Sequence, residues 1–503
     1  MLNRYRSFLL LMFLAGAGLF MSGCEKSWEE YYKGEANSEI SLWDALTTNE
    51  DYSEFADLVE SAGFDTIIRS SQTYTLFVPP NEAFTDFEQD SVELLQMLSY
   101  HISPTIILPA SFQNERKLET YTDKFAQLEK TASMMYFDGI AILNQSMLYR
   151  DGIIYEIEQV ASPRPNLYEY IDQMNSRLSG YIDSRDSVAL DYSQSVPTGF
   201  DDEGNTIYDS VFIITNRFER DFFPVSLESR YNEATMLLVT DEDYNNALDV
   251  MADNLGGSFT NHADIPSDWQ TEFLIPYIFN NGVFNGSRDF QFFMNDSVEN
   301  IQGVLIPMNH TNIDQDSKTI CSNGLAYQYL DFQIPGALYL EEIKYEGESY
   351  VIDQGSGFFA WDAELISTSN DLIQPKILDN ISASEEQYIT VDFPRGSTEI
   401  YSLEIQLPKI FPRPYKLVWR GYYRPSGIVK FYVNDVYVGE FDNYNFRYPV
   451  NGNNPENFFN HIEFDVDNIT TYDDIVVKIE YTGPGIGSQN GICIDYLSLV
   501  PAN

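Results

Sequence analysis

The sequence predicts two α+β domains in tandem, followed by an all-β sandwich of the jelly-roll type. Apolar residues recur at helical spacing through much of the first two thirds of the chain. A strand-then-helix pattern near residue 75 is repeated near residue 235. Beyond about residue 345 the helical spacing gives way to short alternating strands. A chain of 503 residues has room for about three such domains.

The start of the chain carries the features of an export signal. Arg4 and Arg6 precede an uncharged stretch over residues 7–22, which is the length of a signal-peptide core. Cys24 closes the tetrapeptide Met-Ser-Gly-Cys, which resembles the lipobox of bacterial lipoproteins. The resemblance implies that residues 1–23 are removed and that Cys24 is lipidated. An uncleaved membrane anchor is the alternative, although the apolar run is short for a bilayer.

The residues after Cys24 indicate where a lipid anchor would lie. Two or more acyl chains hold a protein stably to a bilayer, so we expect residues 24–40 to be a lipidated tether. The acid-rich segment 25–30 (EKSWEE) resembles a surface-export signal of Gram-negative lipoproteins. This resemblance implies an outer-membrane protein that faces the cell exterior and touches the membrane only through its N-terminal lipid.

The charge of the chain excludes some partners. Asp and Glu total 77 against 29 Lys and Arg, which gives a formal net charge of -48. Nucleic acid and anionic lipid are repelled by such a surface. Hydrophobic residues make up 44% and aromatic residues 15% of the chain, which predicts a folded core rather than disorder.

Three cysteines are present, and lipid would occupy Cys24. Cys321 and Cys493 can pair in an oxidising compartment. They fall in segments that we assign to different domains, so we expect two buried free thiols instead.

The first domain combines helical and strand patterns. Ser41 can cap a helix, because apolar residues from 42 to 62 recur at helical spacing behind it. Residues 73–78 read as a short buried strand that a Pro-Pro pair stops. Another helical pattern covers 94–102, and an Asp-Gly turn opens a closing strand over 151–160.

These segments resemble the two signatures of the fasciclin family. Residues 75–84 (TLFVPPNEAF) match the first signature and 151–160 match the second. The resemblance implies a fasciclin domain over residues 41–164, and binding rather than catalysis. Tyr100 and His101 lie between the signatures, and in animal members such a pair has been linked to receptor contact. A Tyr-His pair at a helix end can equally pack within its own domain, and the sequence leaves both readings open.

A second copy of this pattern follows. Asn166 restarts a helix, residues 235–244 repeat the first signature and 323–331 repeat the closing one. Thr240 stands where the family has proline, and no Tyr-His pair intervenes. We therefore predict a divergent fasciclin-like domain over 165–345. It carries an insertion at about 181–230, which is either functional or a mobile decoration.

The C-terminal region, residues 346–503, reads as a β-sandwich. Residues 428–439 alternate around an Asn-Asp turn as a hairpin does, and two further strands cover 474–481 and 491–500. The hairpin and the Ile-Asp-Tyr-Leu ending resemble jelly-roll modules of the galactose-binding type, which accompany extracellular glycan-handling proteins.

An aromatic run in this region is the candidate ligand site. We expect its rings to face a ligand, because sugar rings stack on such faces. Loops would carry the three residues that follow the hairpin, Tyr444, Phe446 and Tyr448. Core packing and protein-protein contact are the alternatives. The candidate residues are Trp419, Tyr422, Tyr423, Tyr444, Phe446 and Tyr448.

Motifs of catalysis are absent from the sequence. It contains no glycine-rich phosphate loop, Gly-x-Ser-x-Gly elbow, His-Glu-x-x-His pair or Cys-x-x-Cys pair, and its four histidines are not at ligand spacing. We therefore expect no enzyme and no cofactor, although carboxylate-only catalysis leaves no local signature. Acids at 465–468 and 473–474 can hold a structural calcium, but their spacing fits no defined loop.

Two functions are consistent with these observations. The first is a non-catalytic surface lipoprotein that serves as an accessory binding subunit of a nutrient-uptake complex. Its partners would be a TonB-dependent outer-membrane transporter, the transporter's lid lipoprotein and a glycan or peptide ligand. The second is a surface adhesion protein that holds another cell, matrix or polysaccharide through its fasciclin domains.

Overall fold

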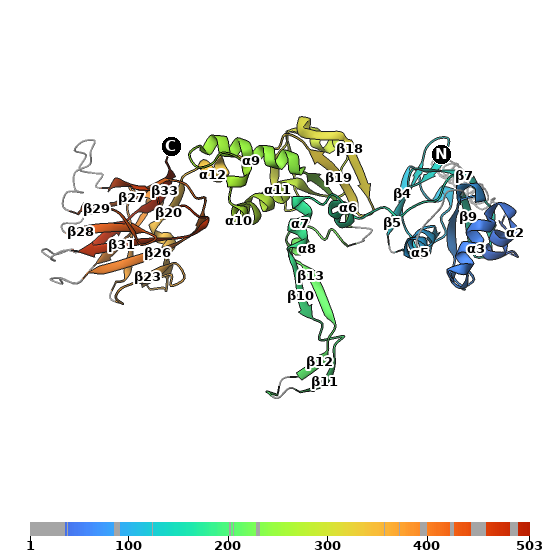
Figure 1. The fold of residues 1–503 in the computed structure, drawn as a ribbon, viewed down its shortest axis with the longest axis horizontal. Helices are drawn as coiled ribbons and strands as arrows, with labels where there is room; N and C mark the ends of the chain where they lie inside the picture. Colours follow the sequence, from blue (N-terminus) through green and yellow to red (C-terminus); the bar gives the residue numbers. More distant parts are fainter. Residues whose placement is uncertain are drawn as a thin grey trace, which may run out of the picture. The chain divides into compact units, whose positions relative to one another are not determined.

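The fold is taken from a computed structural model that describes most of the chain from residue 36 onward (Figure 1). The described residues are 36–37, 39–84, 91–122, 124–200, 203–204, 206–227, 232–356, 358–371, 373–392, 400–422, 427–443, 459–482 and 491–502. The predicted signal peptide and Cys24 lie outside them. Contacts divide the chain into unit 1, residues 1–243 and 277–331, and unit 2, residues 244–276 and 332–503.

The first part of unit 1 is a mixed sheet with helices. Its helices are α2 (Leu42–Thr48), α3 (Ser53–Ser61), α4 (Asp65–Ile68) and α5 (Ser91–Tyr100). Its strands are β1 (Ala36–Asn37), β2 (Tyr74–Val78), β3 (Ile102–Ser103), β4 (Glu115–Glu119), β5 (Phe125–Lys130), β6 (Met135–Phe137), β7 (Ile140–Gln145), β8 (Leu148–Tyr149) and β9 (Gly152–Ile157). Ser41 caps α2 through a 3.0 Å hydrogen bond from the Asp44 amide, as predicted.

β2 is buried on both of its faces. Leu76 packs with the apolar residues of α2 and α3, whereas the neighbouring Phe77 points to the opposite face and stacks on Phe137 with a centroid distance of 4.0 Å. Successive side chains of a strand alternate between faces, so a strand covered on both sides reads as a continuous apolar run. This explains the sequence Tyr-Thr-Leu-Phe-Val, in which all five residues are buried.

The later part of unit 1 contains a second, smaller sheet. Its helices are α6 (Leu167–Gln173), α7 (Arg177–Asp183), α8 (Arg217–Asp221) and α11 (Ile275–Gly282), the last of which begins in unit 2. Its strands are β14 (Ala234–Leu238), β15 (Val283–Asn285), β18 (Ile313–Cys321) and β19 (Gly324–Tyr329), with β16 (Ser297–Glu299) and β17 (Leu305–Pro307) forming a separate pair.

The two sheets of unit 1 share one strand arrangement. β2 pairs parallel with β9 and antiparallel with β3. Likewise, β14 pairs parallel with β19 and antiparallel with β15. In both sheets the first residue of the opening strand faces a glycine that begins the closing strand.

That glycine permits a close approach of two backbones. A Cβ atom placed on Gly152 would lie 2.2 Å from the carbonyl oxygen of Tyr74, and one placed on Gly324 would lie 2.1 Å from that of Ala234. Real Cβ atoms do not come this close to an oxygen, so only glycine allows the strands to pair in this register.

Polar contacts around the strand pair are also repeated. The residue before each glycine accepts a hydrogen bond from the first amide of a helix: Asp151 from Leu42 at 2.6 Å, and Asn323 from Leu167 at 2.8 Å. The hydroxyl group of Thr75, like that of Thr235, donates a hydrogen bond to one backbone carbonyl. It also accepts a hydrogen bond from the backbone amide two residues after that carbonyl. The partners are Thr105 and Ile107 for Thr75, and Gly286 and Arg288 for Thr235.

The insertion predicted at about 181–230 forms a pair of two-stranded ribbons. β10 (Asp186–Leu190) pairs with β13 (Phe212–Asn216), and β11 (Val196–Phe200) pairs with β12 (Thr206–Asp209). The ribbons lead away from α7 and α8, with β11 and β12 at the far end (Figure 1).

Unit 2 joins a helical segment to a large all-β region. The helical elements are α9 (Asp241–Leu255, in unit 2 from Tyr244 on), α10 (Ser267–Trp269) and α12 (Ala337–Leu340). Trp269 meets Phe411 edge-on with a centroid distance of 5.2 Å, and Glu272 forms an ion pair with Lys409 at 2.8 Å. These contacts group residues 244–276 with the strands that follow residue 332.

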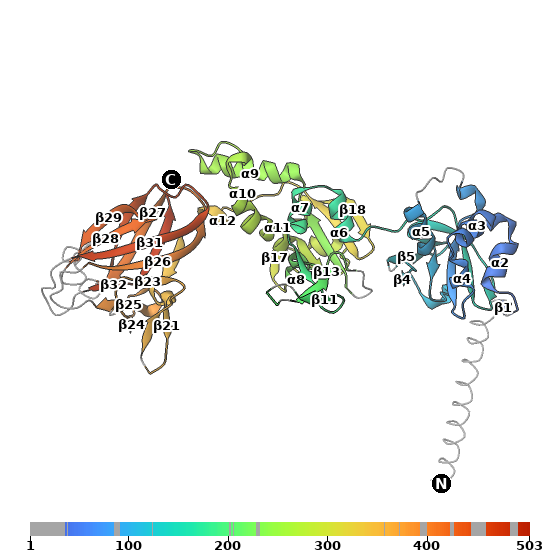
Figure 2. The same cartoon turned by 60° about the horizontal axis from the view of Figure 1, so that its bottom comes forward.

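The strands of unit 2 form several sheets around one core. The two largest have the orders β20-β33-β27-β30 and β23-β26-β31-β28-β29, and a third has the order β24-β25-β32. Figure 2 shows β26, β28, β29 and β31 side by side. The strands are β20 (Ile343–Glu346), β21 (Val351–Asp353), β22 (Phe359–Trp361), β23 (Ile366–Thr368), β24 (Pro375–Asp379), β25 (Gln387–Asp392), β26 (Tyr401–Ile410), β27 (Tyr415–Tyr422), β28 (Ile428–Val433), β29 (Val436–Asp442), β30 (Phe459–Val466), β31 (Asp473–Thr482), β32 (Gly491–Ile494) and β33 (Tyr496–Pro501).

The predicted hairpin over 428–439 is confirmed. β28 and β29 pair antiparallel, and Asn434 and Asp435 at the turn have φ angles of 48° and 64°. Two consecutive positive φ angles are typical of the type I′ turn, which Asn and Asp tolerate better than most residues.

We predict that Gly152→Ala and Gly324→Ala each lower the free energy of unfolding by about 1–3 kcal/mol or more, because the new methyl group meets a backbone oxygen. Urea titration of each variant measures the effect. The matched control is Gly180→Ala in α7, where a Cβ meets nothing within 4 Å. We expect this control to raise stability by about 0.5–1 kcal/mol. Equal stability of all three variants would contradict the close-approach explanation.

Candidate binding sites

The candidate interaction motif Tyr100-His101 lies in the interior. Both side chains are 0% exposed. The hydroxyl of Tyr100 donates to the carboxylate of Asp138, which also forms a 3.2 Å ion pair with Arg164. A receptor cannot touch either side chain while the domain is folded, so the structure favours the packing interpretation of the pair.

His101 links a helix to the end of its domain. Its Nδ1–H donates to the carbonyl of Met97 at 2.7 Å, and its Nε2 accepts a proton from the amide of Ala161 at 3.1 Å. The bond from Ala161 requires the neutral ring, because a protonated Nε2 has no lone pair to accept it. Burial lowers the pKa of His101 to about 4, although its bond to Met97 acts in the opposite direction.

Of the six aromatic residues predicted to bind ligand, two lie in the described part of the chain. Tyr423, Tyr444, Phe446 and Tyr448 lie outside it. Trp419 and Tyr422 are both on β27, not in a loop. Trp419 is 1% exposed and packs edge-on against Phe431 in the core, so its expected place at the surface is corrected. Residues along a strand alternate between faces, and position 419 faces inward.

Tyr422 belongs to an aromatic cluster at one end of the sandwich. It stacks on Tyr388 of β25 with a centroid distance of 6.2 Å, and it meets Phe459 of β30 at 5.5 Å. Tyr388 and Phe459 are 5.2 Å apart and nearly perpendicular. Tyr388 and Tyr422 are half-buried, so each keeps part of its surface accessible. We call Tyr388, Tyr422 and Phe459 the aromatic cluster.

A buried ion pair lies next to the aromatic cluster. Arg420 forms an ion pair with Asp495, whose side chain is fully buried, and its guanidinium lies 5.1 Å from the centre of the Phe459 ring. Arg420 also donates to the carbonyl of Ser382 at 2.8 Å. Burial raises the pKa of Asp495, and the positive charge of Arg420 opposes that rise. The rings are therefore fixed by contacts from three separate strands.

Most of this cluster was not predicted from the sequence. Tyr388, Phe459 and Asp495 lie far from Tyr422 in the chain. The pairing of β27 with β30 sets Phe459 opposite Tyr422, whereas Tyr388 lies on β25, which pairs with β24 and β32. The alternation of residues on β27 was the available signal, because it places Arg420 and Tyr422 on the face opposite to Trp419.

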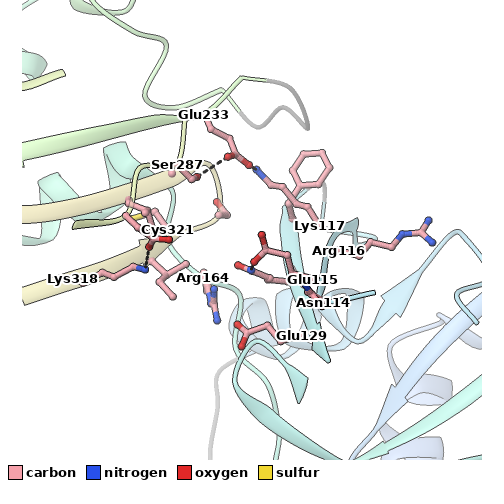
Figure 3. Close-up of a pocket in the computed structure, with 18 of the residues that line it drawn as sticks. Asn114, Glu115, Arg116, Lys117, Glu129, Arg164, Glu233, Ser287, Lys318 and Cys321 are labelled. Atoms are coloured by element: carbon pink, nitrogen blue, oxygen red, sulfur yellow. Dashed lines mark hydrogen bonds and ion pairs between the residues drawn. The ribbon is translucent and has the colours of Figure 1, made fainter. Parts of the chain in front are cut away.

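Unit 1 contains a cavity of about 580 Å³ lined by charged side chains (Figure 3). The Lys117 ammonium on β4 lies 2.7 Å from the carboxylate of Glu233, which also accepts a 2.6 Å hydrogen bond from Ser287. Lys318 on β18 lies 2.6 Å from Asp289. Burial disfavours the charged form of Glu233, but the bonds from Lys117 and Ser287 still hold its pKa below the ordinary value. The wall thus neutralises these two lysines, which makes the cavity a weaker candidate for an ionic ligand.

Neither a metal site nor a membrane helix was found in the part of the chain that the structure describes. No group of three or more His, Cys, Asp and Glu residues there is arranged to hold a metal ion. The helices there lack the length and apolar character needed to cross a bilayer. Cys321 and Cys493, predicted to be buried thiols, are both buried, and the Cys493 sulfur accepts a proton from the Tyr422 amide at 3.0 Å.

Residues 50–163 match the fasciclin domain family, which confirms the predicted family for the first domain. A fasciclin domain at this place supports a non-catalytic binding role.

Solved structures similar to this chain include carbohydrate-binding modules and a polysaccharide lyase. A family 35 module from Clostridium thermocellum is 15% identical, with a TM-score of 0.21, over 32% of this chain and 99% of that one. The family 35 module from Paenibacillus barcinonensis is 12% identical, with a TM-score of 0.20, over 32% and 99%. A Paenibacillus xanthan lyase is 14% identical, with a TM-score of 0.24, over 41% of this chain and 18% of that one.

We predict that the His101 ring stays neutral down to about pH 4. Its pKa is lowered in the folded state, so the stability that it contributes is fully present above about pH 6.5 and is lost as the pH falls to about 4. The loss amounts to about 3 kcal/mol. With only four histidines in the chain, ¹³C-labelled histidine NMR can follow the ring directly. We expect its signal, assigned with His101→Gln, to stay unchanged between pH 8 and 5. A midpoint near pH 6.5 would show that the ring is not held in this way.

Proposed function

We propose that this protein is a lipid-anchored binding protein on the outer face of the outer membrane. It serves as a non-catalytic accessory subunit of a TonB-dependent nutrient-uptake complex, in which it binds a glycan or peptide. Cys24 carries the lipid, and the transporter and its lid lipoprotein are the partners. The sequence features at the N-terminus support the anchor, and the fasciclin match supports a binding role.

The aromatic cluster is the observation that carries the ligand-binding part of this proposal. Aromatic faces bind the C–H surfaces of sugars and the side chains of peptides, and they do so best when the rings are already held in place. The ion pair with Asp495 fixes the guanidinium of Arg420, which in turn contacts the ring of Phe459. Tyr423 follows Tyr422 directly in the sequence, and the segment containing Tyr444, Phe446 and Tyr448 leads into Phe459.

We also infer that residues 165–345 are a divergent fasciclin-like domain. The parallel pairing of β14 with β19, the close approach at Gly324 and the helix contact of Asn323 all have counterparts in the first domain. Thr240, at the place of the family proline, lies two residues beyond the end of β14, and all five residues of β14 pair with β19. The tandem arrangement explains why the chain repeats these features.

Surface adhesion is the second candidate function, and the fasciclin domain at residues 50–163 favours it. In that case the fasciclin domains bind another cell, matrix or polysaccharide, without a transporter. Because Tyr100 and His101 are buried, an adhesive contact would use other residues of the domain.

We predict that Tyr422→Ala weakens ligand binding about 3- to 10-fold, because it removes one ring of the aromatic cluster. The chain from residue 25 onward is screened against an array of neutral and acidic oligosaccharides and a peptide set, and affinities are then measured by calorimetry. The matched control is Tyr437→Ala on β29, whose side chain is 51% exposed and whose ring meets that of Tyr432 with a centroid distance of 5.7 Å. An equal loss in both variants, or no binding on either array, would argue against the cluster as a ligand site.

A further prediction concerns the anchor and the complex. Cys24→Ser removes the acceptor for the acyl chains, so incorporation of an alkyne fatty acid is lost and the protein leaves the membrane fraction.

A mild-detergent pulldown of the wild-type protein from its native outer membrane should recover a transporter and a lid lipoprotein in near-equal amounts. Recovery of this protein alone would rule out the uptake complex and leave adhesion as the favoured function.

A further inference from the structure

The ribbons of the insertion expose an unusual apolar surface. We call residues 186–216 the arm, which comprises β10 to β13 and begins and ends beside α7 and α8 (Figures 1 and 2). Large apolar side chains that are at least 40% exposed occur along its whole length. They are Val188, Tyr192, Val196, Phe200, Ile207, Val211, Phe212, Ile213 and Ile214.

The first ribbon of the arm has two different faces. Val188 pairs with Ile214 and Leu190 pairs with Phe212, so these four side chains share one face. Val188 and Ile214 are each 64% exposed and Phe212 is 61% exposed. On the other face, Ser187 pairs with Thr215, and Ala189 pairs with Ile213, which is 48% exposed. Strand register fixes this division, and the face of Val188, Leu190, Phe212 and Ile214, which we call the apolar face, carries the larger apolar surface. A ribbon whose apolar side chains gather mainly on one face is built to be covered on that face.

Nothing in the described structure covers this apolar face. β10 and β13 pair only with each other among the described strands, and no second layer packs on them. Two-stranded ribbons are marginally stable on their own. Extended exposed apolar surface on a folded protein marks a site of interaction.

The charges of the arm indicate what covers it. Residues 186–216 contain only acidic charges and no lysine or arginine. The acids are Asp186, Asp191, Asp201, Asp202, Glu203 and Asp209. A partner with basic residues around an apolar strip is complementary to this pattern. A second copy of this chain is not complementary, because it would bring two acidic arms together. A lipid surface is not favoured either, because segments that bind anionic lipid carry basic residues, which the arm lacks.

We propose that the arm is a docking element for a different protein, whose contact surface is an apolar strip bordered by lysine and arginine. The apolar face of β10 and β13 supplies the buried contact. The acids orient the partner and keep arms of neighbouring copies apart. This proposal does not depend on ligand binding by the aromatic cluster.

The test uses a photo-crosslinking amino acid at two positions of the lipidated full chain in native outer membranes. Position 214 lies on the apolar face, and position 215 is its matched control on the opposite face. We expect position 214 to crosslink one protein, and position 215 to crosslink it at least about fivefold less, because a buried contact is confined to one face.

The crosslinked protein is then purified and its affinity for arm variants is measured. The double variant Val188→Ser/Ile214→Ser should weaken binding at least about tenfold, and Ser187→Ala/Thr215→Ala should change it less than about twofold. Asp209→Asn/Glu203→Gln should lower both the affinity and its dependence on salt. Thermal unfolding checks that each variant remains folded.

Several outcomes would overturn the proposal. These are crosslinking to a second copy, to another part of the same chain or to lipid, equal crosslinking from both faces, and no crosslink at all. Arm-dependent binding of the purified chain to phosphatidylethanolamine–phosphatidylglycerol vesicles would show that the arm contacts lipid instead. The Tyr422→Ala measurement is unaffected by these results, so failure of the arm proposal is distinguishable from failure of the ligand site.

Discussion

The parallel pairing of an opening strand with a distant closing strand is the constraint on which unit 1 depends. In the first sheet this pairing places β2 between two apolar layers, and it brings Asp151 beneath the first turn of α2. The backbones approach so closely that position 152 tolerates no side chain. The second sheet meets the same constraint with Gly324 and Asn323. Two sequences that share few residues thus share the contacts that the strand pairing imposes.

Local features of the fold were predictable because their causes are local. Ser41 caps its helix three residues ahead, and Asn434 and Asp435 suit the positive φ angles of their turn. The prediction that Trp419 lies at the surface was wrong. Aromatic residues are abundant throughout the chain, so a local run of them does not distinguish a surface site from the core. The sidedness of the arm was also hidden. It arises from the register of β10 with β13, which a gap of more than twenty residues separates in the sequence.

The aromatic cluster shows how long-range contacts prepare a surface. Its three rings come from β25, β27 and β30, and the ion pair of Arg420 with Asp495 joins β27 to the connection between β32 and β33. Burying a charged pair costs desolvation energy, so its value here is to fix position more than to add stability. The polar cavity of unit 1 differs, because Lys117 and Lys318 in its wall already have carboxylate partners.

The strand pairing of unit 1 also sets an order of events for a chain that emerges from its N-terminus. Tyr74 finds its partner only at Gly152, and Ala234 only at Gly324. Neither parallel strand pair can form until the closing strand has emerged. The opening strand and the chain up to that point therefore stay without this pairing until then. Folds dominated by such non-local pairs have high contact order and fold slowly. A chain with such distant strand pairs stays unfolded, and so able to pass through a narrow pore, for longer than a chain built from local hairpins.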